Sequence, residues 1–60
     1  MWRDWKIGQS IHYKVVEFDG TVEMDGVVTE VHDDHAIVSA CDMALWVEDF
    51  NAECFERRTK

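Results

Sequence analysis

Apolar and polar residues alternate along the first predicted strand of this 60-residue chain. Every second residue of Ser10–Val15 is apolar, and a period of two predicts a strand with one buried face. The alternation changes phase at Val15–Val16, after which Val16 and Phe18 hold the apolar positions. A slip of one residue predicts a β-bulge or a sharp bend at this point.

Two Asp-Gly pairs follow this segment, and such pairs are a strong turn signal between β-prone sequences. Asp19–Gly20 predicts the turn of a hairpin, and Asp25–Gly26 predicts a second turn six residues later. Between them, Thr21–Met24 fits a short strand or the arm of a loop. Glycine turns therefore divide the first half of the chain into short extended pieces.

The second half of the chain predicts another hairpin. Val27–Val31 is the clearest strand in the sequence, because β-branched residues dominate it. The polar segment His32–His35 predicts a turn, after which Ala36–Ala40 returns antiparallel. Cys41–Met43 then forms a brief connection to a strand over Ala44–Val47.

A single helical turn is predicted near the end of the chain. Asp49 fits the cap of a turn through Asn51–Glu53, because its carboxylate accepts hydrogen bonds from free backbone amides. Cys54–Arg57 then predicts a closing strand. Residues 1–60 make one domain, in which 1–6 form a lead-in segment and 58–60 form a frayed tail.

These elements predict an all-β fold of the SH3-like barrel type, with about five short antiparallel strands and one helical turn before the last. The chain resembles the SH3-like small β-barrel group, which includes the KOW and Tudor folds, from Trp5 to Arg57. The matching segments are Lys6–Ile11, Asp25–Val31 and Phe50–Cys54. This resemblance implies a fold and leaves the function open, because the group hosts unrelated functions.

In length and element order the chain is also similar to the plasmid-borne, trimethoprim-insensitive dihydrofolate reductases. These short SH3-like barrels build one active site from several identical subunits and depend on a Val-Gln-Ile-Tyr segment. The comparable segment here, Ala44–Val47, reads Ala-Leu-Trp-Val and lacks the amide and the phenol. The resemblance therefore implies the fold and self-association, and it does not imply the reductase activity.

Net charge excludes one large class of partners. The chain carries 13 acidic and 6 basic residues, a formal charge of −7, and residues 15–55 contain no Lys or Arg. Affinity for nucleic acid depends on clustered basic residues, so we expect no direct nucleic-acid binding. The acidic surface predicts instead a protein partner with a basic surface.

Chain length, apolar runs and cysteine content give expectations for the stability and the location of the protein. A chain of 60 residues buries only about 60% of its unfolded surface, so self-association into a homo-oligomer is expected to add stability. No apolar run reaches the ~20 residues of a membrane span, and no secretory segment is recognisable, which predicts a cytoplasmic protein without membrane contact. Cys41 and Cys54 are interpreted as small buried apolar residues rather than as a disulfide.

Aromatic residues supply the remaining site predictions. Tyr13, Phe18, Trp46 and Phe55 are predicted to fill the core or its ends. Trp5 is predicted to close one end of the barrel, and Trp2 to be the more exposed anchor for a partner. Trp46 with Glu48 could also imitate part of the aromatic cage with which Tudor-like domains bind methylated cations. The predicted partner-binding residues are Trp2, Glu30, Asp33, Asp34, Trp46, Glu48 and Asp49.

His32–His35 is the one local cluster with metal-binding chemistry. Imidazole and carboxylate can bind zinc, but the spacing of ligands in a structural site is missing, so a solvated turn is the favoured interpretation. His12 is predicted to face outward into solvent. No arrangement of residues predicts a catalytic site, a metal site or a cofactor.

The sequence therefore predicts a non-enzymatic, acidic protein-interaction module that self-associates. Two alternatives stay open. One is a phage-type inhibitor that mimics the charge of nucleic acid to block a nucleic-acid-binding protein. The other is an enzyme whose site is shared at an oligomer axis.

Overall fold

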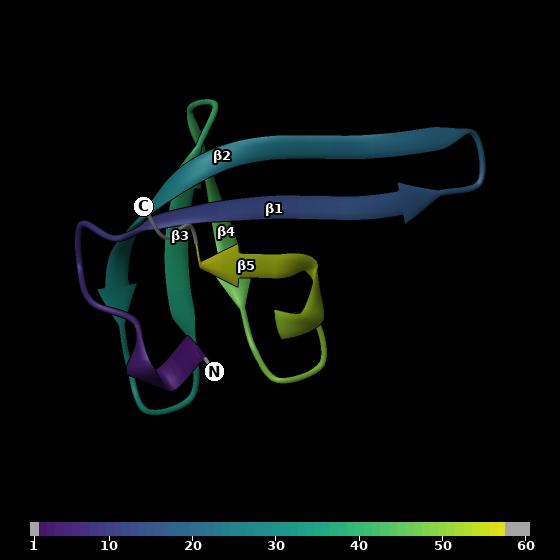
Figure 1. The fold of residues 1–60 in the computed structure, drawn as a ribbon. Helices are drawn as coiled ribbons and strands as arrows, with labels where there is room; N and C mark the ends of the chain where they lie inside the picture. Colours follow the sequence, from purple (N-terminus) through teal and green to yellow (C-terminus); the bar gives the residue numbers. More distant parts are fainter. Residues whose placement is uncertain (1, 58–60) are drawn as a thin grey trace.

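Five antiparallel strands form one curved sheet in a computed structural model that describes residues 2–57. The strands are β1 (Ser10–Glu17), β2 (Gly20–Val31), β3 (Ala36–Ala40), β4 (Met43–Val47) and β5 (Phe55–Arg57). Two 3-10 helices complete the fold, η1 (Trp2–Asp4) and η2 (Ala52–Cys54) (Figure 1). The predicted all-β class and the helical turn before the last strand are confirmed. The tail predicted at 58–60 lies outside the described residues.

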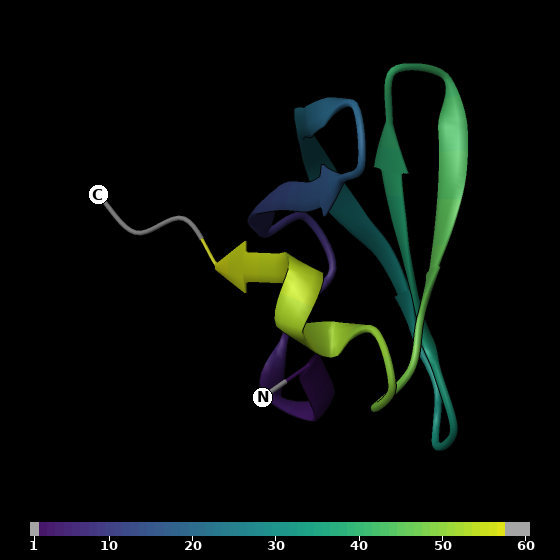
Figure 2. The same ribbon diagram turned by 90° about the vertical axis from the view of Figure 1, so that its right-hand side faces the viewer.

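The strands lie in the order β4-β3-β2-β1-β5, so β4 and β5 are the two edges of the sheet. No pairing joins these edges within residues 2–57, and the barrel is therefore not closed. The long strand β2 takes part in both halves of the sheet, pairing with β1 and with β3. Figure 2 shows β1 and β5 on one side of the molecule and β3 and β4 on the other.

The core lies between these two halves of the sheet. Ile11 of β1, Val38 of β3 and Val47 of β4 face inward and are fully buried. Burial alternates along β3, where every second residue from Ala36 to Ala40 is buried. The two N-terminal tryptophans cover one end of this core. Trp5 is buried and makes an edge-to-face contact with Phe55, with ring centroids 6.2 Å apart, which confirms the predicted lid.

The burial of three aromatic residues differs from the prediction. Trp2 is only 1% exposed, so the prediction that it is an exposed anchor is wrong. Phe18 and Trp46, predicted as core, are fully exposed and 51% exposed respectively. Phe18 lies in the tip of the β1–β2 hairpin, which projects away from the other strands (Figure 1). Trp46 points outward because its strand neighbours, Leu45 and Val47, take the inward positions.

The predicted bulge at Val15–Val16 is wrong. β1 pairs with β2 without interruption from Ser10 to Glu17, and Val16 is exposed. The irregularity lies instead in β2, where the register against β3 shifts between Val28 and Glu30. The extra residue, Thr29, leaves two consecutive side chains of β2 exposed.

The predicted turn at Asp25–Gly26 is also wrong, because β2 runs straight through it. Gly26 is needed for a close approach. A Cβ atom there would lie 2.7 Å from the carbonyl oxygen of Ser39 and 2.7 Å from a methyl carbon of Val38. The glycine therefore lets β2 pack tightly against β3.

The connections at both ends of β4 correct two further predictions. Cys41 and Asp42 form the two-residue turn before β4 with positive φ angles of 50° and 65°, and Cys41 is exposed rather than buried. Asp49 does not cap η2, whose N-cap residue is Asn51 and which has no side-chain cap. The side-chain oxygen of Asn51 accepts from the Glu48 N–H at 2.8 Å, and its amide donates to the Trp46 carbonyl. Asn51 therefore occupies part of the outer edge of β4.

Candidate functional site

Three aromatic rings stack on the outer side of β2, β3 and β4. The His35 imidazole lies on the Trp46 indole, with centroids 3.7 Å apart and an interplanar angle of 6°. The His32 imidazole in turn stacks on that of His35, with ring centroids 4.5 Å apart and an interplanar angle of 29°. His32 and His35 lie in the loop between β2 and β3, and Trp46 lies in β4. The three rings therefore meet only in the folded chain.

Each ring of this stack donates a hydrogen bond to its own carboxylate. His32 Nε2 contacts Glu30 at 2.6 Å, and His35 Nδ1 contacts Asp34 at 2.7 Å. The indole N–H of Trp46 donates to Glu48. We call this set the ring ladder, and its members are His32, His35, Trp46, Glu30, Asp34 and Glu48.

Local backbone structure explains how the ladder forms. The bulge in β2 turns Glu30 outward beside Ile37, and Ile37 pairs with Trp46 in the next strand. The β2–β3 loop is closed by a hydrogen bond of 2.7 Å from the His32 N–H to the His35 carbonyl. This closure brings the two imidazoles together above the end of the sheet.

The carboxylates of the ladder keep hydrogen-bonding capacity. Each histidine uses one ring nitrogen, and each carboxylate uses one oxygen. The hydrogen bond from His35 holds the pKa of Asp34 below its ordinary value. The ladder therefore presents carboxylates that are already oriented beside a half-exposed indole.

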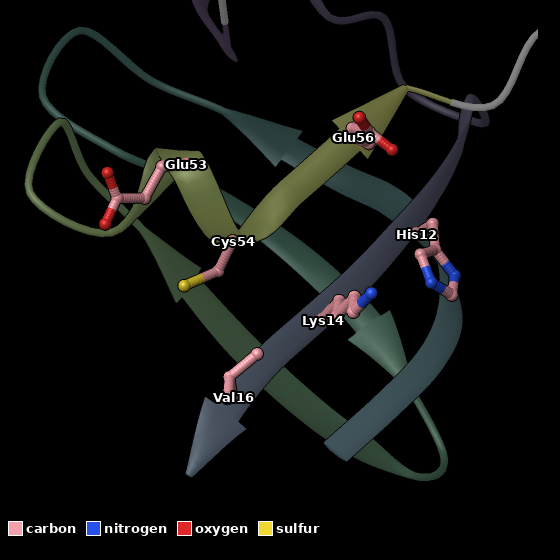
Figure 3. A pocket seen from close by; sticks show the side chains of 6 residues that line it. All are labelled: His12, Lys14, Val16, Glu53, Cys54 and Glu56. Carbon is pink, nitrogen blue, oxygen red and sulfur yellow. The ribbon is translucent and has the colours of Figure 1, made fainter. Parts of the chain in front are cut away.

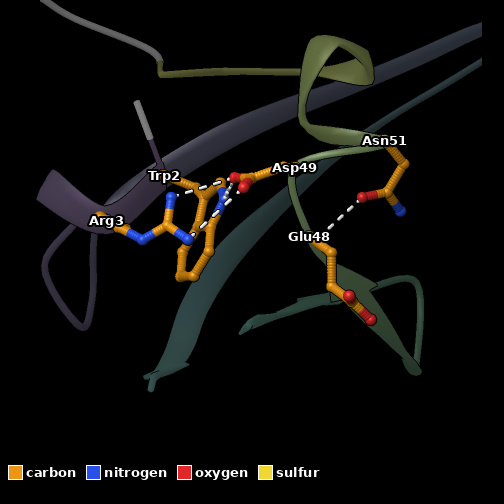
Figure 4. Close-up of polar contacts among 5 residues, drawn as sticks. All are labelled: Trp2, Arg3, Glu48, Asp49 and Asn51. Atoms are coloured by element: carbon orange, nitrogen blue, oxygen red, sulfur yellow. Dashed lines mark hydrogen bonds and ion pairs between the residues drawn. The ribbon is translucent and has the colours of Figure 1, made fainter. Parts of the chain in front are cut away.

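Asp49 belongs to a different contact, at the junction of the N-terminus and the β4–η2 loop (Figure 4). It accepts a hydrogen bond of 2.8 Å from the Trp2 indole N–H and pairs with Arg3 at 3.0 Å. The Arg3 guanidinium also lies over the Trp2 ring, 4.4 Å from the centroid. The Trp2 hydrogen bond first, and Arg3 second, hold the pKa of Asp49 below its ordinary value. Its charge is therefore compensated within the chain.

A third polar group lies on the outer face of β1. His12 Nδ1 contacts Asp25 at 2.8 Å and Nε2 contacts Glu23 at 2.9 Å. Carboxylates only accept, so this arrangement is satisfied by an imidazolium with both nitrogens protonated. His12 faces outward as predicted, but it is engaged rather than solvated. Its positive charge and that of Lys14 offset the acidic residues on this face.

A shallow cavity of about 280 Å³ lies beside this group (Figure 3). It opens where β5 begins and β1 continues beyond its pairing with β5, and side chains of β1, η2 and β5 line it. Acidic, basic, apolar and thiol groups are mixed in its wall, so no single ligand chemistry is favoured there. The lining residues are His12, Lys14, Val16, Glu53, Cys54 and Glu56.

The structure divides the predicted partner-binding residues between two places. Glu30, Asp34, Trp46 and Glu48 all belong to the ring ladder, and Asp33 is exposed in the same loop. Trp2 and Asp49 instead belong to the compensated junction. Glu48 and Asp49 are adjacent in sequence but bind different tryptophans.

Sequence reasoning missed the part played by His32 and His35. They were interpreted as solvated turn residues, yet the side chain of His35 is only 16% exposed. The available signal was a pair of histidines around an acidic turn. Within residues 2–57 no group of three or more His, Cys, Asp or Glu is arranged to hold a metal ion.

Comparisons with protein-family models, with curated proteins and with solved structures find no match to this chain. In the described part of the chain, no helix has the length and apolar character needed to cross a membrane.

Proposed function

We propose that the chain is a non-enzymatic, acidic protein-interaction module that binds a partner with a basic surface through the ring ladder. The single observation that carries this proposal is the half-exposed indole of Trp46, stacked on His35 and hydrogen-bonded to Glu48. Tryptophan is enriched at the energetic centres of protein interfaces. A side chain already held on two sides loses little conformational freedom when a partner covers it.

Charge supports the choice of surface. Glu23 and Asp25 of β2 are engaged by His12, and Asp49 is paired with Arg3. The carboxylates of the ladder are bound by ring N–H groups, and no arginine or lysine of residues 2–57 pairs with them. Exposed apolar surface and uncompensated negative charge therefore coincide at the ladder.

Self-association is a second part of the proposal. The projecting tip of the β1–β2 hairpin exposes Val16 and Phe18, and β4 is an edge strand whose outer side Asn51 covers only in part. Unpaired edges and exposed apolar side chains favour association with another chain. Light scattering at several concentrations tests this part, and a monomer at high micromolar concentration would contradict it.

The stacked rings also favour the nucleic-acid mimic as a second candidate. Three stacked rings with a carboxylate beside each one present flat aromatic faces and negative charge in the same order as stacked bases and phosphates. Under this candidate, an oligonucleotide would compete with the chain for the captured partner. Absence of competition would leave the interaction module and remove the mimic.

The test compares two matched double variants of the immobilised chain. Trp46→Ser with Glu48→Gln removes an aromatic and an acid from the ladder, whereas Phe50→Ser with Glu53→Gln removes the same types elsewhere on the surface. We expect a partner that is retained by the wild type and the control pair and lost by the ladder pair. The purified partner is then titrated with each form at increasing salt, which should weaken binding because the Debye length shortens. Equal binding by all three forms would contradict the proposal.

A further inference from the structure

We propose that the ring ladder recognises an arginine side chain of the partner, which stacks on Trp46 and pairs with Glu48. This inference rests on the proposed function and specifies the chemistry of the partner. Its support is the similarity between two tryptophan–carboxylate pairs of the molecule, Trp2 with Asp49 and Trp46 with Glu48. Residues 2–57 contain one complete tryptophan–carboxylate–arginine group and one group of the same kind in which these residues supply no arginine.

The complete group is at the N-terminal junction (Figure 4). Trp2 donates its indole N–H to Asp49, and the Arg3 guanidinium lies over the Trp2 ring. Arg3 reaches both carboxylate oxygens, with nitrogen–oxygen distances of 3.0 and 3.5 Å. One carboxylate thus binds the edge of the indole and the cation that covers its face.

The incomplete group is on the ladder. Trp46 donates its indole N–H to Glu48, which repeats the first half of the Trp2–Asp49 arrangement. Within residues 2–57 no arginine or lysine contacts Trp46, and residues 15–55 contain none. The second oxygen of Glu48 accepts no hydrogen bond from a described residue.

The faces of the indole decide where the cation would lie. His35 covers one face of Trp46, nearly parallel to it, and the side chain is still 51% exposed. The accessible part is therefore what His35 leaves uncovered. A cation placed over a tryptophan face is attracted by the ring, and tryptophan is the best aromatic residue for this contact.

Arginine fits this group better than lysine does. The guanidinium is planar, so it can stack on the indole while its N–H groups donate to a carboxylate. An ammonium group is a compact, strongly hydrated charge and gains less from a flat ring. The expected signature is discrimination between two peptides of equal charge.

The experiment uses three synthetic peptides in which glycine alternates with arginine, lysine or citrulline. Citrulline keeps the planar shape of arginine and removes the charge. Each peptide is titrated into the full chain at low salt, and the indole N–H signal of Trp46 and the backbone amide signals of β4 are followed by NMR, so that variants without Trp46 can also be read. We expect the arginine peptide to bind about three- to tenfold more tightly than the lysine peptide, the range of a surface cation–π contact with its ion pair. The citrulline peptide should not bind measurably.

Substitutions locate the effect. Trp46→Leu and Glu48→Gln should each remove the preference for arginine, whereas Phe50→Leu and Glu53→Gln should keep it. Both ladder substitutions fall on exposed or half-buried side chains, and the dispersion of the remaining NMR signals shows whether each variant is folded.

The possible outcomes separate the inference from the proposed function. Equal binding of arginine and lysine peptides, lost on Trp46→Leu, would overturn the arginine assignment and keep the interaction module. Binding of neither charged peptide at the ladder would overturn both. A dimer that Trp46→Leu dissociates would assign the ladder to a second copy of the chain, and it would also overturn the inference.

Discussion

The indole N–H of Trp2 donates a hydrogen bond of 2.8 Å to Asp49, a residue 47 positions later in the chain. This contact joins η1 to the loop between β4 and η2, two segments that share no strand pairing. The Trp2 ring fills the end of the core, where it is 1% exposed. The N-terminal segment is therefore part of the folded domain rather than a lead-in to it.

Replacing Trp2 with alanine should unfold most of the protein. A buried aromatic replaced by alanine costs about 3–5 kcal/mol, and the core of so small a domain supplies about 3–5 kcal/mol in total. Urea denaturation followed by circular dichroism measures the loss. Trp2→Phe keeps most of the ring and should lose less. Trp46→Ala, on a half-exposed residue, should cost about 1 kcal/mol or less, and an equal loss at both tryptophans would contradict the assigned burial.

Asp49 should make stability depend on pH in the acid range. Its pKa in the folded protein is lowered by the Trp2 hydrogen bond and by Arg3, so the folded state favours the ionised carboxyl. The resulting stability is present above the unfolded pKa of about 4 and is lost as pH falls through the lower folded pKa. Asp49→Asn keeps an oxygen for the indole and removes the charge.

The difference in unfolding free energy between wild type and Asp49→Asn should therefore be largest near neutral pH. It should shrink below about pH 4, as the wild-type carboxyl becomes protonated. Urea titrations at pH 7, 5 and 3 measure this difference. A difference that stays constant over the three values would show that the charge of Asp49 does not contribute.

Most of the strands could be predicted because strand and turn signals lie within short stretches of the sequence. The Asp19–Gly20 turn and the β-branched run of Val27–Val31 both lie where they were expected. The lead-in segment carries no periodic pattern, so nothing local could assign Trp2 to the core. Asp25–Gly26 was predicted to be a turn, because glycine is favoured both in turns and where two strands approach closely. Only the packing of β3 against β2 distinguishes the two.

Gly26→Ala tests that distinction. The added methyl group would meet the Ser39 carbonyl and the Val38 side chain at 2.7 Å, a distance that requires the strands to separate. Overpacking of this kind costs about 1–3 kcal/mol. Val27→Ala, on the adjacent outward residue, should cost less than about 1 kcal/mol. Thermal and urea unfolding compare the two, and a neutral Gly26→Ala would contradict the close approach of β2 and β3 at this position.

The site was predictable in its charges and not in its geometry. Net acidity pointed to Glu30, Asp34 and Glu48, and the resemblance of Trp46 with Glu48 to part of an aromatic cage drew attention to Trp46. The ring stack depends on the bulge at Thr29 and on the pairing of Ile37 with Trp46. Both are relationships between strands, and an alternating pattern along one strand does not encode them.

The β3–β4 turn offers a stabilising substitution. Cys41 and Asp42 both have positive φ, a region that side chains other than glycine and asparagine adopt at a cost. A two-residue hairpin turn with both angles positive favours Asn-Gly. Cys41→Asn with Asp42→Gly should therefore raise the unfolding free energy by about 1 kcal/mol. Thermal unfolding measured by calorimetry should show a higher midpoint.

The β1–β2 hairpin supplies the control for this substitution. Its turn residue Asp19 has no positive φ, so Asp19→Gly gains no relief of strain and adds freedom to the unfolded chain. It should leave the midpoint unchanged or lower it. The same Asp-to-Gly change thus has opposite expected effects at two turns of one molecule, because the backbone angle differs and the side chains are exposed at both. Equal gains at both turns would show that the effect does not come from the left-handed backbone of the β3–β4 turn.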